Sequence, residues 1–336
     1  MNYPVCMVEF YSCRVPGFRN QDPLHRELGV LLSSCMHNRP QVGSSFLVTV
    51  KFGVVFPHNE IGTDSEAIKS YAVGVDRDLK ADHMLIYDHV LGVDPNLHHG
   101  WSGPYDKDVA FHEPFTVFAF MAAVTETVEF ATSVLVLPQR QTALVAKQAA
   151  ELAILSNYRL RMGIGTGWND VEYEALDVPF EHRGSRQAEQ VELMRKLWTD
   201  DSLLYEGRFH TVSHASILPR PERAIPIWFG GIAPPLLRRC ALLGDGWFPL
   251  GTPNEQSARA IETMRKVREE HGLSWKEFGI QAQAQYRGGT PERWKRHARR
   301  WADLGCTHLA IATHNAGNTT VEQHLEAARR YLDAVR

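Results

Sequence analysis

The sequence predicts an α/β fold in which parallel strands alternate with helices, the (β/α)8 or TIM barrel. Two observations favour it. Eight short apolar segments of strand length recur between residues 48 and 336, separated by segments with helical spacing. The first and fourth strand segments are apolar almost throughout, which is typical of parallel strands buried on both faces. A doubly wound open sheet has the same alternation and is the second candidate.

The expected strands have few polar residues and end near glycine, proline or polar side chains. In chain order they are Val50–Phe56, Met84–Tyr87, Phe130–Leu137, Leu160–Ile164, Ile225–Phe229, Gly246–Leu250, Gly279–Tyr286 and His308–Ala312. In a barrel, the carboxyl ends of all strands lie on one face, and active sites are found there. We therefore look for functional residues immediately after these segments.

The expected helices are marked by capping patterns. Thr63-x-x-Glu66 and Thr319-x-x-Glu322 have the form of capping boxes. Thr290-Pro291 predicts the start of another helix, which Gly305 ends. The expected helical segments are 67–79, 115–124, 144–155, 183–198, 234–244, 255–270, 290–305 and 319–332.

Two connections are longer than a barrel needs. Val93–His112, after the second strand, is too long to be a mere link, so we interpret it as a substrate loop or lid. Thr199–Ala224 is an insertion between the helix after the fourth strand and the fifth strand.

Composition excludes several classes of protein. The 336 residues carry a net charge of −3, without a basic block that would indicate nucleic-acid binding. No apolar run approaches the roughly 20 residues that cross a membrane. The five cysteines lack metal-binding spacing, so we expect a soluble, cytoplasmic protein without structural disulfides.

The first 47 residues differ from the rest. They show no clear helix or strand period and mix prolines and glycines with three of the five cysteines. We expect residues 1–47 to be a non-native or disordered N-terminal extension and residues 48–336 to be the barrel domain. A small structural cap is the alternative for residues 1–47.

The fourth strand ends in closely spaced glycines: Gly163, Gly165 and Gly167. Such a strand end offers bare backbone on which a flat or anionic ligand can lie, although a crowded turn explains glycines equally well. The spacing is not the dinucleotide fingerprint, because Trp168 stands where the third glycine of that pattern belongs. Asn169 and Glu172 follow just beyond.

Other strand ends also carry candidate groups. Asp88-His89 follows the second strand, where an imidazole can exchange a proton near neutral pH. Gly230-Gly231 precedes a proline-started helix and has the outline of an anion site, with a simple tight turn as the equal alternative. His58 has no second histidine at metal-binding spacing, and no nucleophile motif occurs, so we expect no catalytic metal.

Taken together, these motifs resemble the luciferase-like monooxygenase superfamily of flavin- and deazaflavin-dependent enzymes. The resemblance runs over nearly the whole chain after Val48. Its segments are K-F-G-V-V-F-P at 51–57, I-Y-D-H at 86–89, T-S-V-L-V-L-P at 132–138, G-I-G-T-G-W-N-D-V-E-Y at 163–173, R-K-L-W-T at 195–199, Y-E-G-R-F-H at 205–210, and the later P-I-W-F-G-G and G-D-G-W-F-P.

The sequence of the glycine segment is similar to that of the branch that uses coenzyme F420, a deazaflavin. The resemblance implies that His89 lies near the reactive ring and that the Ser133–Val134 peptide bond is cis and supports the ring. It implies catalytic roles for His89 and Trp168. The implied cofactor-binding residues are Asp88, His89, Ser133, Val134, Gly165, Thr166, Gly167, Gly230 and Gly231, the last two at the phosphate.

One departure limits the analogy. In F420-dependent glucose-6-phosphate dehydrogenases an acidic glutamate follows the glycines, whereas this chain has Trp168 there. Sugar-phosphate oxidation is therefore not carried over. Trp168 and Trp101 are candidate walls for a substrate, although ordinary packing is favoured for Trp101.

The resemblance implies hydride transfer between F420 and an unknown small organic substrate, in a protein that is usually a homodimer. The first alternative is a monooxygenase that uses reduced FMN and oxygen, with a separate reductase as partner. The second is a barrel that binds a cofactor without turnover. A metal-dependent barrel hydrolase is a third and weaker alternative.

Overall fold

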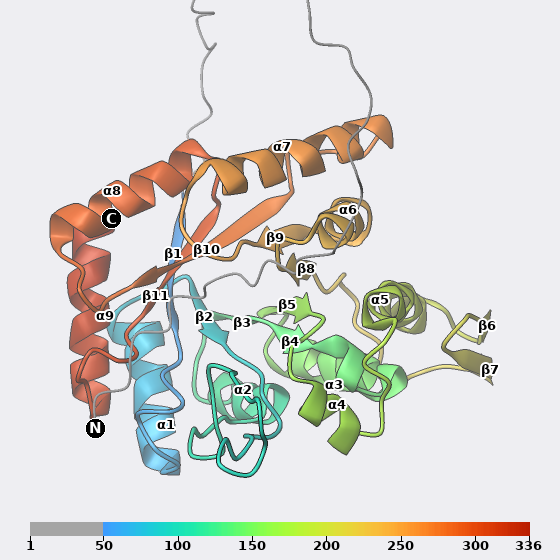
Figure 1. Cartoon of the computed structure of the whole chain (residues 1–336), viewed down its shortest axis with the longest axis horizontal. Helices are drawn as coiled ribbons and strands as arrows, with labels where there is room; N and C mark the ends of the chain where they lie inside the picture. The colour runs from blue at the N-terminus through green and yellow to red at the C-terminus, as the bar shows by residue number, and fades with distance from the viewer. Residues whose placement is uncertain (1–49) are drawn as a thin grey trace, which may run out of the picture. The chain divides into compact units, whose positions relative to one another are not determined.

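Eight parallel strand positions close into a barrel in the computed structural model, which describes residues 50–336 (Figure 1). The strand order is β3-β2-β1-β11-β10-β9-β8-β5-β4, and a further pairing of β3 with β5 closes the ring. The expected N-terminal extension, residues 1–47, lies outside the described residues. The (β/α)8 prediction is confirmed, and the open sheet is excluded because the first and last positions are joined.

All eight expected strand positions are found. The barrel strands are β1 (Lys51–Val55), β2 (His83–Ile86), β3 (Glu129–Thr132), β4 (Leu135–Val136), β5 (Leu160–Gly165), β8 (Ile227–Gly230), β9 (Gly246–Phe248), β10 (Gly279–Gln285) and β11 (His308–Ala312). The third position differs from the expected single strand, because β3 and β4 share it and both pair with β5. Ser133 and Val134 form the break between them.

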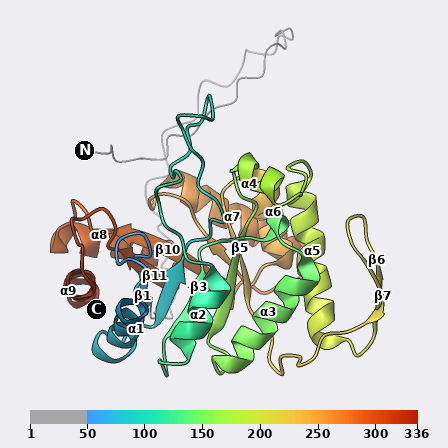
Figure 2. The ribbon, with the colours of Figure 1, turned by 90° about the horizontal axis from the view of Figure 1, so that it is seen from below.

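The helices surround the strands (Figure 2). They are α1 (Ser65–Val73), α2 (Pro114–Ala122), α3 (Thr142–Leu155), α4 (Asp170–Ala175), α5 (Arg183–Thr199), α6 (Pro234–Leu243), α7 (Glu255–Glu270), α8 (Pro291–Asp303) and α9 (Val321–Val335), with a π-helical turn at Gly74–Asp78 and a 3₁₀ turn at Leu137–Gln139. Every expected helix is present. The short helix α4 was not expected. None of the helices in residues 50–336 is long and apolar enough to span a membrane.

The two capping boxes predict Thr63 and Thr319 as N-caps, and in the structure each N-cap is the next residue along the chain. The cap of α1 is Asp64, whose carboxylate accepts from the N–H of Glu66, and the cap of α9 is Thr320, whose hydroxyl accepts from the N–H of Gln323. The pattern of a short polar residue before an apolar helix was right, but two neighbouring residues could fill the role. At α8 the expected Thr290 cap and Gly305 stop are both found.

The insertion after the fourth strand position contains an antiparallel hairpin that the sequence did not reveal. It consists of β6 (Leu203–Glu206) and β7 (Thr211–Ala215), which pair only with each other. Both views place the hairpin beside α5, away from the barrel strands (Figures 1 and 2). Its strands are mostly exposed, so they lack the apolar signal that marked the barrel strands.

Two apolar clusters hold the described residues together. The larger lies between the outer faces of the strands and the helices, as the helical spacing predicted. The smaller, inside the ring of strands, consists of Val55, Leu85, Ala131, Trp228, Phe248, Ala310 and Ala312. The interior also holds the buried guanidinium of Arg161, which pairs with Glu129 at 2.9 Å and lies 4.2 Å from the centre of the Trp228 ring.

Candidate active site

The candidate residues gather at the carboxyl ends of neighbouring barrel strands. Parallel pairing of β2 with β3, and of β3 and β4 with β5, brings three of the chosen strand ends side by side. β8, which ends at Gly230, pairs with β5 on the other side. We refer to this end of the barrel as the mouth.

Val134 occupies the middle of the mouth segment between β3 and β4. The Ser133–Val134 peptide bond is cis, as the resemblance implied. The Val134 side chain lies between two of the chosen glycines. A Cβ atom on Gly165 would stand 2.5 Å from its Cγ2, and one on Gly230 would stand 2.7 Å from its Cγ1. These two glycines therefore make room for Val134, and its side chain, together with their backbone, forms the surface they line.

The other glycines of the fourth strand have different reasons. A Cβ on Gly163 would stand 2.0 Å from the backbone oxygen of Thr132, so this position faces packed chain and has no room for a side chain. Gly167 has a φ of 68° and sits against Val136, which suits the crowded-turn explanation. The exposed backbone surface expected from the glycine spacing is thus smaller than three glycines suggested. Of the three, only Gly165 lines the Val134 surface.

Ser133 is fixed from inside the barrel. Its hydroxyl accepts from Nε2 of Gln283 at 2.8 Å, and Oε1 of Gln283 accepts from the hydroxyl of Tyr87 at 2.9 Å. Sequence reasoning did not single out Gln283. The alternation of glutamines at 281, 283 and 285 was the available signal, because residues two apart on a strand share one face.

Asp88 supports the same segment from the other side. Its side chain is 1% exposed, and its two oxygens accept from the N–H of Val136 and from Nη2 of Arg140, each at 2.8 Å. Burial raises the pKa of the Asp88 carboxyl, while Arg140 and the Val136 N–H oppose that effect. Because both oxygens are engaged by the protein, Asp88 acts on the mouth through the backbone it holds.

His89 is held by a buried carboxylate. Its Nδ1 lies 3.2 Å from Oε1 of Glu172, which also accepts from the N–H groups of Val90 and Leu91. Oε2 of Glu172 accepts from Nε2 of Gln139 at 3.0 Å. Glu172 comes from α4, whose start is capped by Asn169. The residues just beyond the glycine strand thus reach back to the candidate histidine.

The pKa of Glu172 is shifted by competing effects. Burial acts to raise the pKa, but the hydrogen bonds from His89 and Gln139, the charge of a protonated His89, and the N–H of Leu91 outweigh it, so that the pKa is lowered. The carboxyl group is therefore ionised at neutral pH and can only accept hydrogen bonds.

Aromatic rings surround His89. The centres of the Phe111, Tyr105 and Trp168 rings lie 4.8, 5.1 and 5.6 Å from that of its imidazole. Phe111 and Tyr105 belong to the long connection after β2, which therefore reaches the candidate site, as its length suggested. Trp168 is 43% exposed and presents indole surface at the mouth.

The Trp101 ring lies 5.4 Å from that of Trp168. Both indoles cover Gly103, where a Cβ would stand 2.4 Å from Trp101 and 2.6 Å from Trp168. This agrees with the packing role favoured for Trp101. The pair joins the loop after β2 to the turn after β5.

The sequence offered His58 only as an unpaired candidate metal ligand, whereas the structure places it beside a second histidine at the mouth, His314. His58 is buried, and its ring centre lies 4.6 Å from that of Phe111, 5.9 Å from Tyr87 and 6.2 Å from His314. Burial, reinforced by the nearby His314, lowers the pKa of His58 to about 3. Both histidines follow strands that pair in the barrel, which is a link that spacing along the chain does not show. In residues 50–336 no three ligand-type side chains are grouped to hold a metal ion.

The Gly230-Gly231 turn offers fewer donors than expected. The N–H of Gly231 donates to the oxygen of Phe248, and Pro234 and Pro235 at the start of α6 have no N–H. An anion at this turn would depend chiefly on the N–H groups of Ile232 and Ala233.

Three arginines that could otherwise neutralise an anion are engaged elsewhere in the protein. Arg140 pairs with Asp88 and Glu113, while Arg183 and Arg186 donate to backbone oxygens in the turn before α5.

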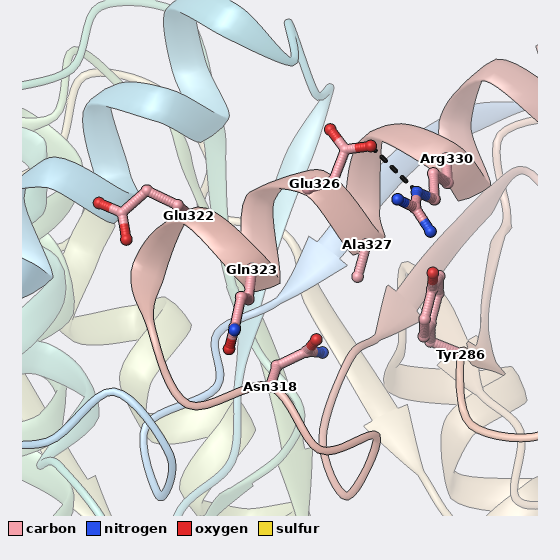
Figure 3. Close-up of a pocket in the computed structure, with 7 residues that line it drawn as sticks. All are labelled: Tyr286, Asn318, Glu322, Gln323, Glu326, Ala327 and Arg330. Atoms are coloured by element: carbon pink, nitrogen blue, oxygen red, sulfur yellow. Dashed lines mark hydrogen bonds and ion pairs between the residues drawn. The ribbon is translucent and has the colours of Figure 1, made fainter.

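Two cavities lie beside α9 and the end of β10. One of about 280 Å³ is lined by Tyr286, Asn318, Glu322, Gln323, Glu326, Ala327 and Arg330, where Arg330 pairs with Glu326 (Figure 3). A neighbouring cavity of about 560 Å³ shares Tyr286 and Arg330 and extends toward α8. None of the candidate residues lines either cavity, so the site rests on its side-chain geometry.

The closed ring of parallel strands with helices around it defines a (β/α)8 barrel protein. The model of the luciferase-like monooxygenase family matches residues 94–334, and the chain belongs to this family. The resemblance noted from the sequence motifs is thereby confirmed.

Relatives and solved structures agree with this placement. The chain is 40% identical over 162 residues to an uncharacterized protein of Mycobacterium tuberculosis, covering 48% of this chain and 56% of that one. It is 29% identical over 188 residues to an F420-dependent glucose-6-phosphate dehydrogenase of Amycolatopsis mediterranei, covering 54% and 50%. The chain thus spans about half the length of these curated relatives.

The fold also matches solved structures. A structure of an F420-dependent secondary alcohol dehydrogenase with an F420–acetone adduct superposes with a TM-score of 0.67 at 15% identity, covering 85% of this chain and 99% of that one.

Proposed function

We propose that this protein is an oxidoreductase that binds coenzyme F420 at the barrel mouth and transfers a hydride between the deazaflavin and a small organic substrate. The observation that carries the proposal is His89, held by Glu172 at the end of β2, next to the strand position that presents Val134. Family membership and the F420-dependent relatives support the choice of cofactor.

The mouth suits a flat ring. Val134, with a glycine on either side, presents a small apolar surface without a projecting long side chain. Gly165 lines this surface with backbone, and the chain continues through Thr166, whose oxygen is already taken by the hydroxyl of Tyr173, to Gly167 in the turn beyond. The N–H groups of Ile232 and Ala233 would meet a phosphate of the cofactor tail. F420, when bound, supplies the ring carbon that gives or accepts the hydride.

The protein's own contribution would be orientation and proton exchange. In the oxidation of an alcohol, the hydride from its C–H bond would go to bound F420, and His89 would accept the proton of the neighbouring O–H as the C=O bond forms. Reduction is the reverse. Trp168 and the rings beside His89 would form apolar walls for the substrate, which fits an uncharged organic molecule better than a sugar phosphate.

A paired titration tests the proposal. Purified full-length protein is titrated with F420 and, separately, with FMN, and binding is followed by cofactor fluorescence. We expect saturation by F420 at micromolar concentration and weaker binding of FMN. The Gly165→Ala variant should weaken F420 binding because its methyl group displaces Val134. Leu155→Ala, an exposed position at the carboxyl end of α3, should not.

Other outcomes have definite meanings. Preference for FMN would support the two-component monooxygenase. F420 binding without oxidation or reduction of any member of a broad substrate panel would support a non-catalytic barrel. No binding of either cofactor would overturn the proposal.

A further inference from the structure

Glu172 makes an unusual set of contacts for a single carboxylate. It is fully buried, yet it accepts four hydrogen bonds, three at Oε1 and one at Oε2. Two come from consecutive backbone N–H groups just after His89, and one comes from the His89 ring itself. The carboxylate therefore fixes both the imidazole and the backbone that carries it.

This arrangement selects one form of the imidazole. An ionised carboxylate has no proton to donate, so the nitrogen that faces it must carry one. At His89 that nitrogen is Nδ1. In the neutral ring the lone pair then lies on Nε2, which has no hydrogen bond within residues 50–336 and is the nitrogen left for a bound molecule.

A second carboxylate–imidazole pair in the same chain provides a contrast. Glu189 accepts from Nδ1 of His210 at 2.8 Å and from the N–H groups of Arg208 and Phe209. There, however, Nε2 is closed by the hydroxyl of Thr142 at 2.7 Å. Both nitrogens of His210 serve to hold the β6–β7 turn, whereas His89 keeps one nitrogen for another partner.

We propose that Glu172 is a positioning residue, which keeps a proton on Nδ1 of His89 and so presents Nε2 as the atom that exchanges a proton with the substrate. The exchange of a proton with a substrate rests on the proposed function, but the position of the proton on the His89 ring does not. It is a property of the protein without cofactor or substrate.

The test reads the tautomer directly. Full-length protein is labelled with ¹⁵N-histidine, and ring nitrogen shifts are recorded by NMR without cofactor, at a pH where His89 is neutral. The His89→Gln variant assigns the His89 signals among the sixteen histidines. We expect a protonated Nδ1 and an unprotonated Nε2. A protonated Nε2 in the wild-type protein would overturn the proposal without any need for a Glu172 variant.

Variants then ask whether Glu172 sets the tautomer. Glu172→Met removes the acceptor, and we expect the Nδ1–H form to lose its dominance. Glu172→Gln keeps an oxygen for Nδ1–H and should retain it. Glu174→Gln, an exposed acid on the same helix, is the matched control and should change nothing. An unchanged Nδ1–H form in a folded Glu172→Met protein would overturn the proposal.

The two proposals fail separately. Absence of F420 binding would overturn the proposed function and leave the measured tautomer standing. F420 binding with the proton on Nε2 would leave the cofactor assignment standing and remove the role of Glu172.

Discussion

Val134 fills the space that Gly165 leaves: a Cβ on residue 165 would stand 2.5 Å from Cγ2 of Val134. The two residues lie on neighbouring strand positions, because the chain around Val134 continues into β4, which pairs with β5. The glycine spacing of the fourth strand therefore reflects a fit between two segments of the barrel. The surface that results belongs to both.

Gly165→Ala should destabilise the protein through this contact. Forcing a methyl group into packed surroundings costs about 1–3 kcal/mol. Adding Val134→Ala should recover part of that loss, because it removes the methyl group that clashes. Urea unfolding of the two single variants and the double variant measures the coupling. Strictly additive effects would show that the two side chains do not compete for space.

Asp88→Asn should be costly although it changes few atoms. The amide oxygen can still accept from the N–H of Val136, but the largely buried Arg140 loses one of its two carboxylate partners. Breaking a buried pair in this way costs about 3 kcal/mol. Glu126→Gln is the control, because its pair with Arg77 is exposed and should be worth less than about 1 kcal/mol. Thermal unfolding with equal losses in the two variants would contradict this.

Stability should fall as the pH drops below about 6.5, partly because of His58. Burial lowers its pKa from 6.5 to about 3, so between these values the unfolded chain binds a proton that the folded protein does not. The stabilisation from burying the neutral ring is complete above pH 6.5 and is lost as the pH falls toward 3. In His58→Gln the slope of unfolding free energy against pH should decrease by up to about 1.4 kcal/mol per pH unit. An identical slope would refute the contribution of His58.

Trp101→Ala should loosen the loop after β2 more than the barrel. Trp101 joins this loop to Trp168, which follows the glycines at the end of β5. Limited proteolysis should cut residues 93–112 faster in this variant, with little change in global unfolding. Leu97→Ala, at a side chain that is 80% exposed, should behave like the wild type. Equal cleavage rates in the two variants would mean that the indole pair does not hold the loop.

Much of the architecture was predictable because hydrophobic periods and helix-capping patterns are local features of the sequence. Apolar segments such as Leu160–Ile164 could be assigned to strands, and the capped helices to their places, since burial repeats along each element with its own period. The cis peptide bond at Ser133–Val134 was expected from the family resemblance, because no hydrophobic period in the sequence indicates it. The β6–β7 hairpin was not predicted, because its exposed strands lack an apolar face.

The sequence by itself determined the barrel, its family and the position of His89 at a strand end. Only the tertiary structure decided that Glu172, 83 residues away, holds that histidine, that Val134 needs Gly165, and that the N–H of Gly231 is already engaged. The reason is that the spacing of apolar residues along the chain depends only on the helix or strand that contains them. Its partners are fixed by which elements become neighbours when the ring of strands closes.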